Sequence, residues 1–210
     1  MIIIQIVEDH KLVADSLSPR INESGRVLVT GTYYNLQSCR EGLANSIPDI
    51  LLLDIDLPDG NGVDFCVEAK KRYPVLKIIM LTGYKEFNIV KHALHNGASG
   101  YILKNAEIEE MLAGIEIVNS GEQFLCEEID VLLKDKKNEP VIWLTDCEKV
   151  VLDYISKGYT RKEIADLRCR DEETIKTHWR NLLVKFNAKN TAELVKKACD
   201  MNFLQQTKQG

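Results

Sequence analysis

Residues 50–62 read Ile-Leu-Leu-Leu-Asp-Ile-Asp-Leu-Pro-Asp-Gly-Asn-Gly, an unbroken apolar run that ends in a carboxylate and a turn. A strand with apolar residues at every position is typical of a parallel sheet covered on both faces. Asp54 closes this run, and Pro58 and Gly60 lie in the polar loop that follows. The stretch therefore predicts a buried strand that places Asp54 at its carboxyl end.

Similar apolar runs alternate with amphipathic segments through the first 120 residues. The expected strands are rich in Ile, Val and Leu: Ile2–Val7, Val27–Thr32, Ile50–Asp54, Lys77–Thr82 and Gly100–Leu103. The expected helices have apolar residues three and four positions apart: Leu12–Asn22, Leu36–Ser46, Val63–Tyr73, Phe87–Asn96 and Ile108–Ser120. This alternation predicts an α/β fold with a doubly wound, five-stranded parallel sheet of strand order 2-1-3-4-5.

The alternation stops after Ser120, and only helical segments follow the charged, proline-ended stretch Lys134–Pro140. We therefore expect a first domain over residues 1–121, an exposed linker over 122–142 and a small all-α domain over 143–210. The four helices expected in the second domain are Asp146–Ser156, Thr160–Leu167, Glu172–Phe186 and Thr191–Met201.

The net charge of −5 is unevenly distributed along the chain. The last 70 residues carry 13 Lys and Arg against 10 Asp and Glu, whereas the first 140 carry 14 against 22. An acidic first part and a basic second part indicate different partners for the two domains.

The composition also indicates where the protein resides. No apolar run approaches the ~20 residues needed to span a bilayer, and Met1–Val7 is too short for the core of a signal peptide. The six cysteines show neither Cys-x-x-Cys spacing nor a histidine at metal-ligand spacing, which is typical of reduced thiols. We therefore expect a cytoplasmic protein without a membrane partner.

Polar residues follow the strands that would line the crevice of the sheet. In a doubly wound sheet, ligands bind outside the carboxyl ends of the strands where the winding reverses, here between the first and third strands. Glu8 and Asp9 follow the first strand, Asp54 ends the third, Thr82 ends the fourth and Lys104 follows the fifth. The topology therefore brings three carboxylates, a hydroxyl and an ammonium group to one edge.

This collection of groups suits phosphoryl transfer to a carboxylate. Clustered carboxylates favour a hard dication such as Mg²⁺, and one carboxylate can form an acyl phosphate. A lysine and a hydroxyl can then balance the charge on the phosphoryl oxygens. We assign Asp54 as the nucleophile, Asp9 as the principal metal ligand and Glu8 as a direct or water-mediated ligand. Thr82 and Lys104 would contact the phosphoryl group.

Residues 1–120 resemble the receiver domain of the two-component response regulators. The matching residues are the acidic pair Glu8-Asp9, the stretch Asp54–Gly62, Thr82, and the run Ala93–Lys104. The resemblance implies that a histidine kinase phosphorylates Asp54, and that the chain is no enzyme beyond its own phosphorylation and dephosphorylation. It also implies that the backbone carbonyl of Asp56 binds the metal ion, and that Thr82 and Tyr101 form a switch in which the tyrosine ring follows Thr82 inward.

The Asp54-Ile55-Asp56 motif also fits a different class, the phosphatases of the haloacid dehalogenase type, in which the second Asp is a general acid. Those enzymes keep a late acidic pair, which is not evident here, and Glu8 and Asp9 would have no role in one. We therefore favour the receiver domain and expect the Asp56 carboxylate to alter the lifetime of the acyl phosphate.

The second domain shows the pattern of a helix-turn-helix. Thr160 with Glu163 predicts a capping box, and Asp171 predicts the N-cap of a second helix. That helix has an apolar stripe of Ile175, Leu182, Leu183 and Phe186. Off the stripe lie basic and polar residues suited to the major groove of DNA: Lys176, Thr177, Arg180 and Lys185.

The second domain resembles the LuxR-type helix-turn-helix, through Leu144–Leu152, Lys162–Ala165, Thr174–His178, Asn181, Lys185 and Thr191. Together the two resemblances place the chain in the NarL/FixJ class, which binds double-stranded DNA and is expected to form a homodimer when phosphorylated. They imply that Lys176, Thr177 and Arg180 approach base edges. They also imply that His178, Asn181 and Lys185 hold phosphates or support the helix. The last helix, with Leu194, Val195, Ala198 and Cys199, is the implied dimer surface.

Several residues depart from the LuxR-type pattern. Arg168 and Arg170 replace apolar residues of the turn, which leaves Leu167 and Cys169 to supply its burial. Two acidic residues at 172 and 173 begin the second helix and should repel phosphate. These departures support an alternative, in which the second domain is a phosphorylation-dependent protein-interaction module.

Overall fold

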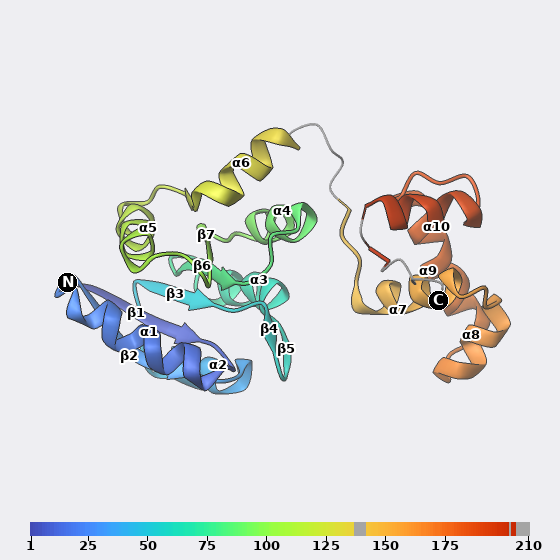
Figure 1. Cartoon of the computed structure of the whole chain (residues 1–210). Helices are drawn as coiled ribbons and strands as arrows, with labels where there is room; N and C mark the ends of the chain where they lie inside the picture. Colours follow the sequence, from blue (N-terminus) through green and yellow to red (C-terminus); the bar gives the residue numbers. More distant parts are fainter. Residues whose placement is uncertain (137–141, 202, 205–210) are drawn as a thin grey trace. The chain divides into compact units, whose positions relative to one another are not determined.

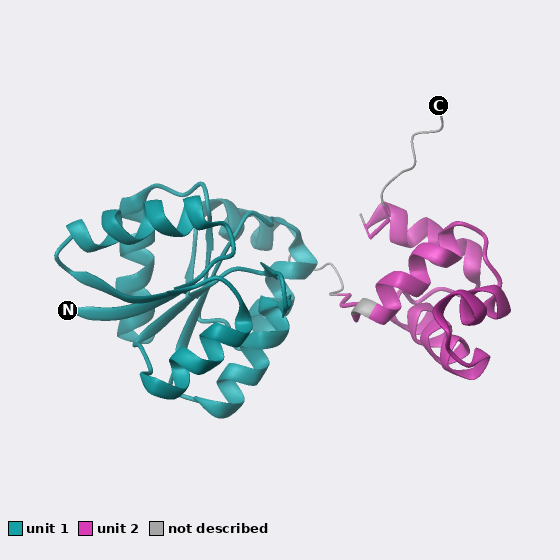
Figure 2. Ribbon diagram, turned by 90° about the horizontal axis from the view of Figure 1, so that it is seen from below, with its two compact units in different colours: residues 1–141 teal, residues 142–210 magenta. Residues whose placement is uncertain are grey.

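The chain divides into two compact units, Met1–Val141 and Ile142–Gly210 (Figure 2). The computed structural model describes residues 1–136, 142–201 and 203–204. Within these ranges no helix combines the length and the apolar character needed to cross a membrane.

The first unit is built on a parallel sheet with the strand order β2-β1-β3-β6-β7-β8, and Figure 1 labels the first five of these strands. The strands are β1 (Ile2–Val7), β2 (Val27–Tyr33), β3 (Ile50–Leu53), β6 (Lys77–Thr82), β7 (Gly100–Leu103) and β8 (Phe124–Leu125). The first five follow the predicted 2-1-3-4-5 order. A short antiparallel hairpin of β4 (Asp56–Leu57) and β5 (Gly60–Asn61) lies where the sequence indicates only a loop.

Helices cover both faces of this sheet. On one face α1 (Lys11–Glu23) and α5 (Ile108–Ser120) pack against alternate residues of the strands, among them Ile50 and Leu52. On the other face α2 (Leu36–Asn45), α3 (Gly62–Arg72), α4 (Phe87–His95) and α6 (Glu127–Asp135) contribute to a second core that includes Leu51 and Leu53. Alternate residues of β3 point to opposite faces of the sheet and enter two different apolar cores. This explains why the apolar run of β3 is unbroken.

The segment after α5 differs from the linker expected over residues 122–142. Gly121 ends α5 with a φ of 99°, and β8 then pairs in parallel with Gly100 and Tyr101 of β7. This pairing covers the otherwise open edge of the sheet. The helix α6 buries Ile129 completely, together with Cys126 at its N-cap.

The first unit therefore extends through α6, and the predicted boundary at residue 121 is wrong. The physical reason is the apolar stripe of α6, in which Leu132 and Leu133 continue the packing of Ile129 against the core. Residues 137–141 of the expected linker lie outside the described residues.

Within residues 142–201, the second unit packs four helices around one core: α7 (Asp146–Ser156), α8 (Arg161–Arg168), α9 (Glu172–Lys185) and α10 (Thr191–Asp200). The predicted caps are confirmed. Thr160 and Glu163 form a capping box at α8, and the Asp171 side chain accepts the backbone N–H of Thr174 at α9. On α10, Leu194 and Ala198 are fully buried in the core, whereas Val195 and Cys199 stay partly exposed.

The turn between α8 and α9 is open to solvent. Leu167 is 54% exposed, and Arg168, Cys169 and Arg170 are exposed as well. Cys169 adopts a left-handed conformation with a φ of 48°, which ends α8. Leu167 and Cys169 therefore do not supply the expected burial, because the inward-facing positions of α8 are already taken by Ile164 and Ala165.

Candidate functional site

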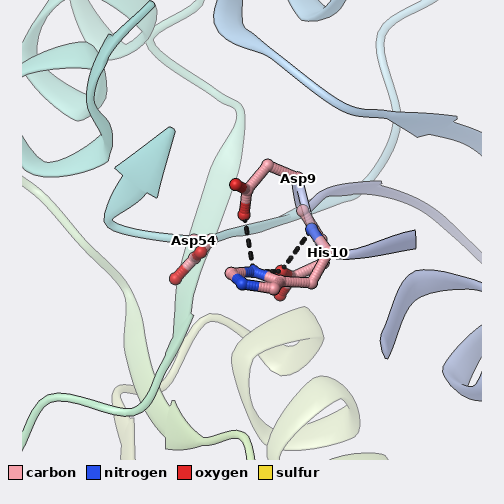
Figure 3. Close-up of side chains that lie close together, drawn as sticks. Asp9, His10 and Asp54 are labelled. Carbon is pink, nitrogen blue, oxygen red and sulfur yellow. Dashed lines mark hydrogen bonds and ion pairs between the residues drawn. The ribbon is translucent and has the colours of Figure 1, made fainter. Parts of the chain in front are cut away.

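Three carboxylates and a histidine meet at the carboxyl ends of β1 and β3. One ligand atom each from Glu8, Asp9, His10 and Asp54 lies within 4.8 Å of the others. Figure 3 shows Asp9, His10 and Asp54 gathered around one point. The adjacent pairing of β1 and β3 produces this meeting, as the predicted switch point requires.

Lys104 joins the two most buried carboxylates. Its Nζ lies 2.7 Å from Glu8 Oε2 and 2.9 Å from Asp54 Oδ2. Burial alone would lower the pKa of Lys104, but the bonds to Glu8 and Asp54 outweigh it, and the net shift is upward. Lys104 is therefore a charged group poised at the acceptor, where the sequence places it.

The carboxyl of Asp54 is held in an environment that disfavours its charge. Burial raises its pKa to about 6, and the negative charge of Glu8 adds to the increase. The Lys104 ammonium and the backbone N–H of Ile55, which donates to Oδ1 at 2.8 Å, act in the opposite direction. Three carboxylates around one lysine leave an excess of negative charge, and oxygen donors of this kind fit Mg²⁺.

His10 is a member of the site that the sequence reasoning missed. Its Nδ1 lies 2.7 Å from Asp9 Oδ1 and 3.1 Å from Glu8 Oε1, and its backbone N–H donates to the same Glu8 oxygen. The sequence feature that could have identified His10 is its position directly after the acidic pair, where the structure has the N-cap of α1. The imidazole contacts the two carboxylates that are the expected metal ligands.

A chain of hydrogen bonds connects the loops around Asp54 with the predicted switch residues. Thr82 is fully buried, and its Oγ1 accepts the backbone N–H of Tyr84 at 3.2 Å. The Tyr84 hydroxyl donates to the Asp56 carboxylate, which raises the pKa of Tyr84 to about 12. The buried Tyr101 hydroxyl donates to the Tyr84 carbonyl at 2.9 Å. Tyr84, which the sequence reasoning did not identify, thus contacts Thr82, Tyr101 and Asp56.

The predicted DNA-facing residues divide into two groups on α9. Lys176, Thr177 and Arg180 are exposed, whereas His178 and Asn181 are partly buried. This division follows from helical periodicity, because Ile175, Trp179 and Leu182 face the core of the unit.

Lys185 has a structural contact. Its Nζ lies 2.6 Å from Oε2 of Glu148, which is only 3% exposed and also accepts the backbone N–H of Thr145. The contact joins the C-terminal end of α9 to the N-terminus of α7. Of the two roles considered for Lys185, support of the helix is therefore the one that its contact favours.

Comparisons with known families agree with both halves of this geometry. Residues 4–116 match the response regulator receiver domain, and residues 143–198 match the luxR family of bacterial regulatory proteins. The chain is a response regulator. It belongs to the NarL/FixJ class, whose members are transcription factors and not enzymes.

Relatives of this response regulator match over nearly its whole length. It is 30% identical to the DNA-binding transcriptional activator DevR/DosR of Mycobacterium tuberculosis, over 88% of each chain. It is also 30% identical to the response regulator VraR of Staphylococcus saprophyticus, over 95% of this chain and 97% of VraR. A structure of RcsB from Salmonella enterica serovar Typhimurium bound to promoter DNA shares the fold, with a TM-score of 0.65 and 22% identity over 93% and 97% of the two chains.

Proposed function

We propose that this response regulator accepts a phosphoryl group on Asp54 from a histidine kinase and then binds promoter DNA. The observation that carries the proposal is the contact of Asp54 with Lys104 beside Glu8 and Asp9. In the transfer, an Asp54 carboxylate oxygen forms a bond to phosphorus while the bond from phosphorus to the kinase histidine nitrogen breaks, and the imidazole leaves. The product is an acyl phosphate on Asp54.

The surrounding residues have distinct roles in this proposal. Glu8, Asp9 and Asp54, with the backbone carbonyl of Asp56, would hold Mg²⁺, which supplies positive charge to the transferring group when bound. Lys104 would exchange its contact with Asp54 for one with a phosphoryl oxygen, and the Thr82 hydroxyl would donate to another. These donors neutralise the charge that the phosphoryl group brings into a largely buried site.

We propose that Thr82 and Tyr101 form the switch that responds to this change. Because Tyr84 bonds to both, movement of Thr82 toward a phosphoryl oxygen would displace the loop that holds the Tyr101 hydroxyl. The local change of charge at Asp54 would thereby shift the loop that contains Tyr84, together with the Tyr101 side chain, from one packed position to another. Formation of a homodimer in the cytoplasm is the proposed outcome.

The second unit would bind double-stranded DNA through α9. Lys176, Thr177 and Arg180 are exposed on α9, and we propose that they reach base edges in the major groove. His178 and Asn181 lie beside this face and would contact phosphates, which set affinity and salt dependence.

The test is enrichment of sites from random-sequence double-stranded DNA, using the full chain with and without acetyl phosphate and Mg²⁺. We expect the wild type to enrich a defined site and to bind it more tightly after acetyl phosphate treatment, and the Asp54→Asn variant to show no gain. Lys176→Ala should weaken binding to that site in gel-shift titration, whereas Lys157→Ala, which removes a lysine from the end of α7, should not. A wild type that enriches no site would contradict the proposal and favour a protein partner.

A further inference from the structure

The first two turns of α9 carry an acidic and a basic side chain in direct contact. The Lys176 Nζ lies 2.9 Å from Glu173 Oε1 and 3.2 Å from Glu173 Oε2. Both side chains are open to solvent, with 76% of Glu173 and 56% of Lys176 exposed. Neither is therefore committed to the core of the unit.

Hydrogen bonds at the start of α9 hold the backbone that carries Glu173 and Lys176. Asp171 accepts the Thr174 backbone N–H at 2.7 Å and the Thr174 hydroxyl at 2.6 Å, so the start of α9 is held by its cap. The Thr177 hydroxyl donates to the Glu173 carbonyl at 3.0 Å and is satisfied within the helix. In a helix-turn-helix, residues near this end of the second helix contact base edges.

Helical spacing places Glu173 with the residues proposed to face DNA. Lys176, Thr177 and Arg180 follow it by three, four and seven positions, so the four share one face of α9. A carboxylate on that face would be repelled by phosphate, but the adjacent ammonium offsets its charge. The pair then presents a hydrogen-bond acceptor directly beside a set of donors.

One base pair matches this arrangement in the major groove. The cytosine N4 amino group is a donor, and its guanine partner offers the O6 and N7 acceptors beside it. Glutamate accepts from cytosine N4, and lysine donates to guanine O6 and N7. An A·T pair also offers one donor and two acceptors, but its adenine N6 donor lies between the N7 and O4 acceptors, so no two acceptors lie side by side for a cation.

We propose that Glu173 and Lys176 together read a single G·C base pair, Glu173 accepting from the cytosine and Lys176 donating to the guanine. This inference rests on the proposed binding of DNA by α9 and names its sequence preference at one position. Glu173 is thereby a specificity-determining residue.

The experiment selects sites from random-sequence double-stranded DNA with the acetyl phosphate-treated full chain, as wild type, Glu173→Gln, Lys176→Ala and Glu172→Gln. The wild type should prefer G·C over the other pairs at one position by about fivefold or more. In Glu173→Gln that preference should fall to about twofold or less, with adenine gaining because glutamine pairs with it. Lys176→Ala should lose the preference at the same position.

Glu172→Gln is the matched control, because it removes the same charge one residue away; its selected site should equal that of the wild type. The inference is overturned if Glu173→Gln selects the wild-type site and merely binds all sequences more tightly, or if the two pair variants alter different positions. A wild type that enriches no site would overturn the proposed DNA binding itself, and this inference with it.

Discussion

The Lys104 ammonium nitrogen lies between two buried carboxylates, 2.7 Å from Glu8 Oε2 and 2.9 Å from Asp54 Oδ2. Glu8 is fully buried and Asp54 is only 2% exposed, so one lysine is a counterion for two groups that water hardly reaches. A phosphoryl group on Asp54 would need the same cation. The contact is therefore a ready source of charge stabilisation for the acyl phosphate.

Removing this cation should slow phosphorylation. We expect Lys104→Gln to reduce the initial rate of Asp54 labelling by acetyl phosphate at saturating Mg²⁺ by about tenfold or more, as loss of a preorganised donor does. Intact-mass measurement over time gives the rate. Lys85→Gln, which loses only a surface ion pair with Glu128, should label like the wild type. Equal rates for both variants would argue against a role of Lys104 in the transfer.

Loss of the Tyr101 hydroxyl should weaken the switch without affecting the chemistry. Tyr101→Phe removes one hydrogen bond to the Tyr84 carbonyl, worth about 0.5–1.5 kcal/mol. We expect Asp54 labelling within about twofold of the wild type, and a gain in DNA affinity on phosphorylation that is smaller by about 2- to 10-fold. Fluorescence anisotropy with a selected site measures this gain. If the variant keeps the full gain, the hydroxyl has no part in the switch.

The segment that follows α5 should behave as part of the first unit. Ile129 is fully buried beneath α6, so Ile129→Ala should lower the free energy of unfolding of this unit by about 2–5 kcal/mol. Val131 on the same helix is 50% exposed, so Val131→Ala should change the free energy of unfolding by less than about 0.5 kcal/mol. Hydrogen exchange of the β-sheet amides reports the stability of this unit. Equal protection in both variants would mean that α6 is not docked.

The ion pair between the buried Glu148 and the partly exposed Lys185 should make the stability of the second unit depend on pH. Burial would raise the pKa of Glu148, but the bonds from Lys185 and Thr145 outweigh it and hold the pKa below its ordinary value of 4.5. The stabilisation is thus complete above pH 4.5 and is lost as the pH falls through the lower folded-state value.

Glu148→Gln should therefore lower the free energy of unfolding by about 1–3 kcal/mol at pH 7. The difference in unfolding free energy between the variant and the wild type should narrow below pH 4.5. Tryptophan fluorescence during urea unfolding isolates this unit, because both tryptophans of the chain, Trp143 and Trp179, lie in it. If the difference in unfolding free energy between Glu148→Gln and the wild type is constant from pH 7 to pH 3, the charge of Glu148 contributes nothing to stability.

Much of the fold and the first site could be predicted because parallel strands expose their carboxyl ends at one edge. The apolar run of β3 and the polar residue after each strand were enough to bring Asp54, Glu8 and Lys104 together. The capping residues Thr160 and Asp171 were equally predictable, since a cap depends on residues only three positions away.

The remaining features depend on contacts that the linear pattern does not contain. The acidic residues of α6 obscured an apolar stripe that packs on the core beside α4. Tyr84 and Asp56 are 28 positions apart, and their bond arises only when the loops after β3 and β6 meet. His10 reaches the carboxylates because the chain turns there into α1.

The central claim is that Asp54 is a phosphoacceptor, and mass measurement of the intact chain after incubation with acetyl phosphate and Mg²⁺ tests it most directly. We predict one phosphoryl adduct on the wild type, mapped to the peptide that contains Asp54, and none on Asp54→Asn or when a chelator removes Mg²⁺. An adduct that persists in Asp54→Asn, or rapid turnover of phosphomonoesters by the wild type without any adduct, would contradict the account.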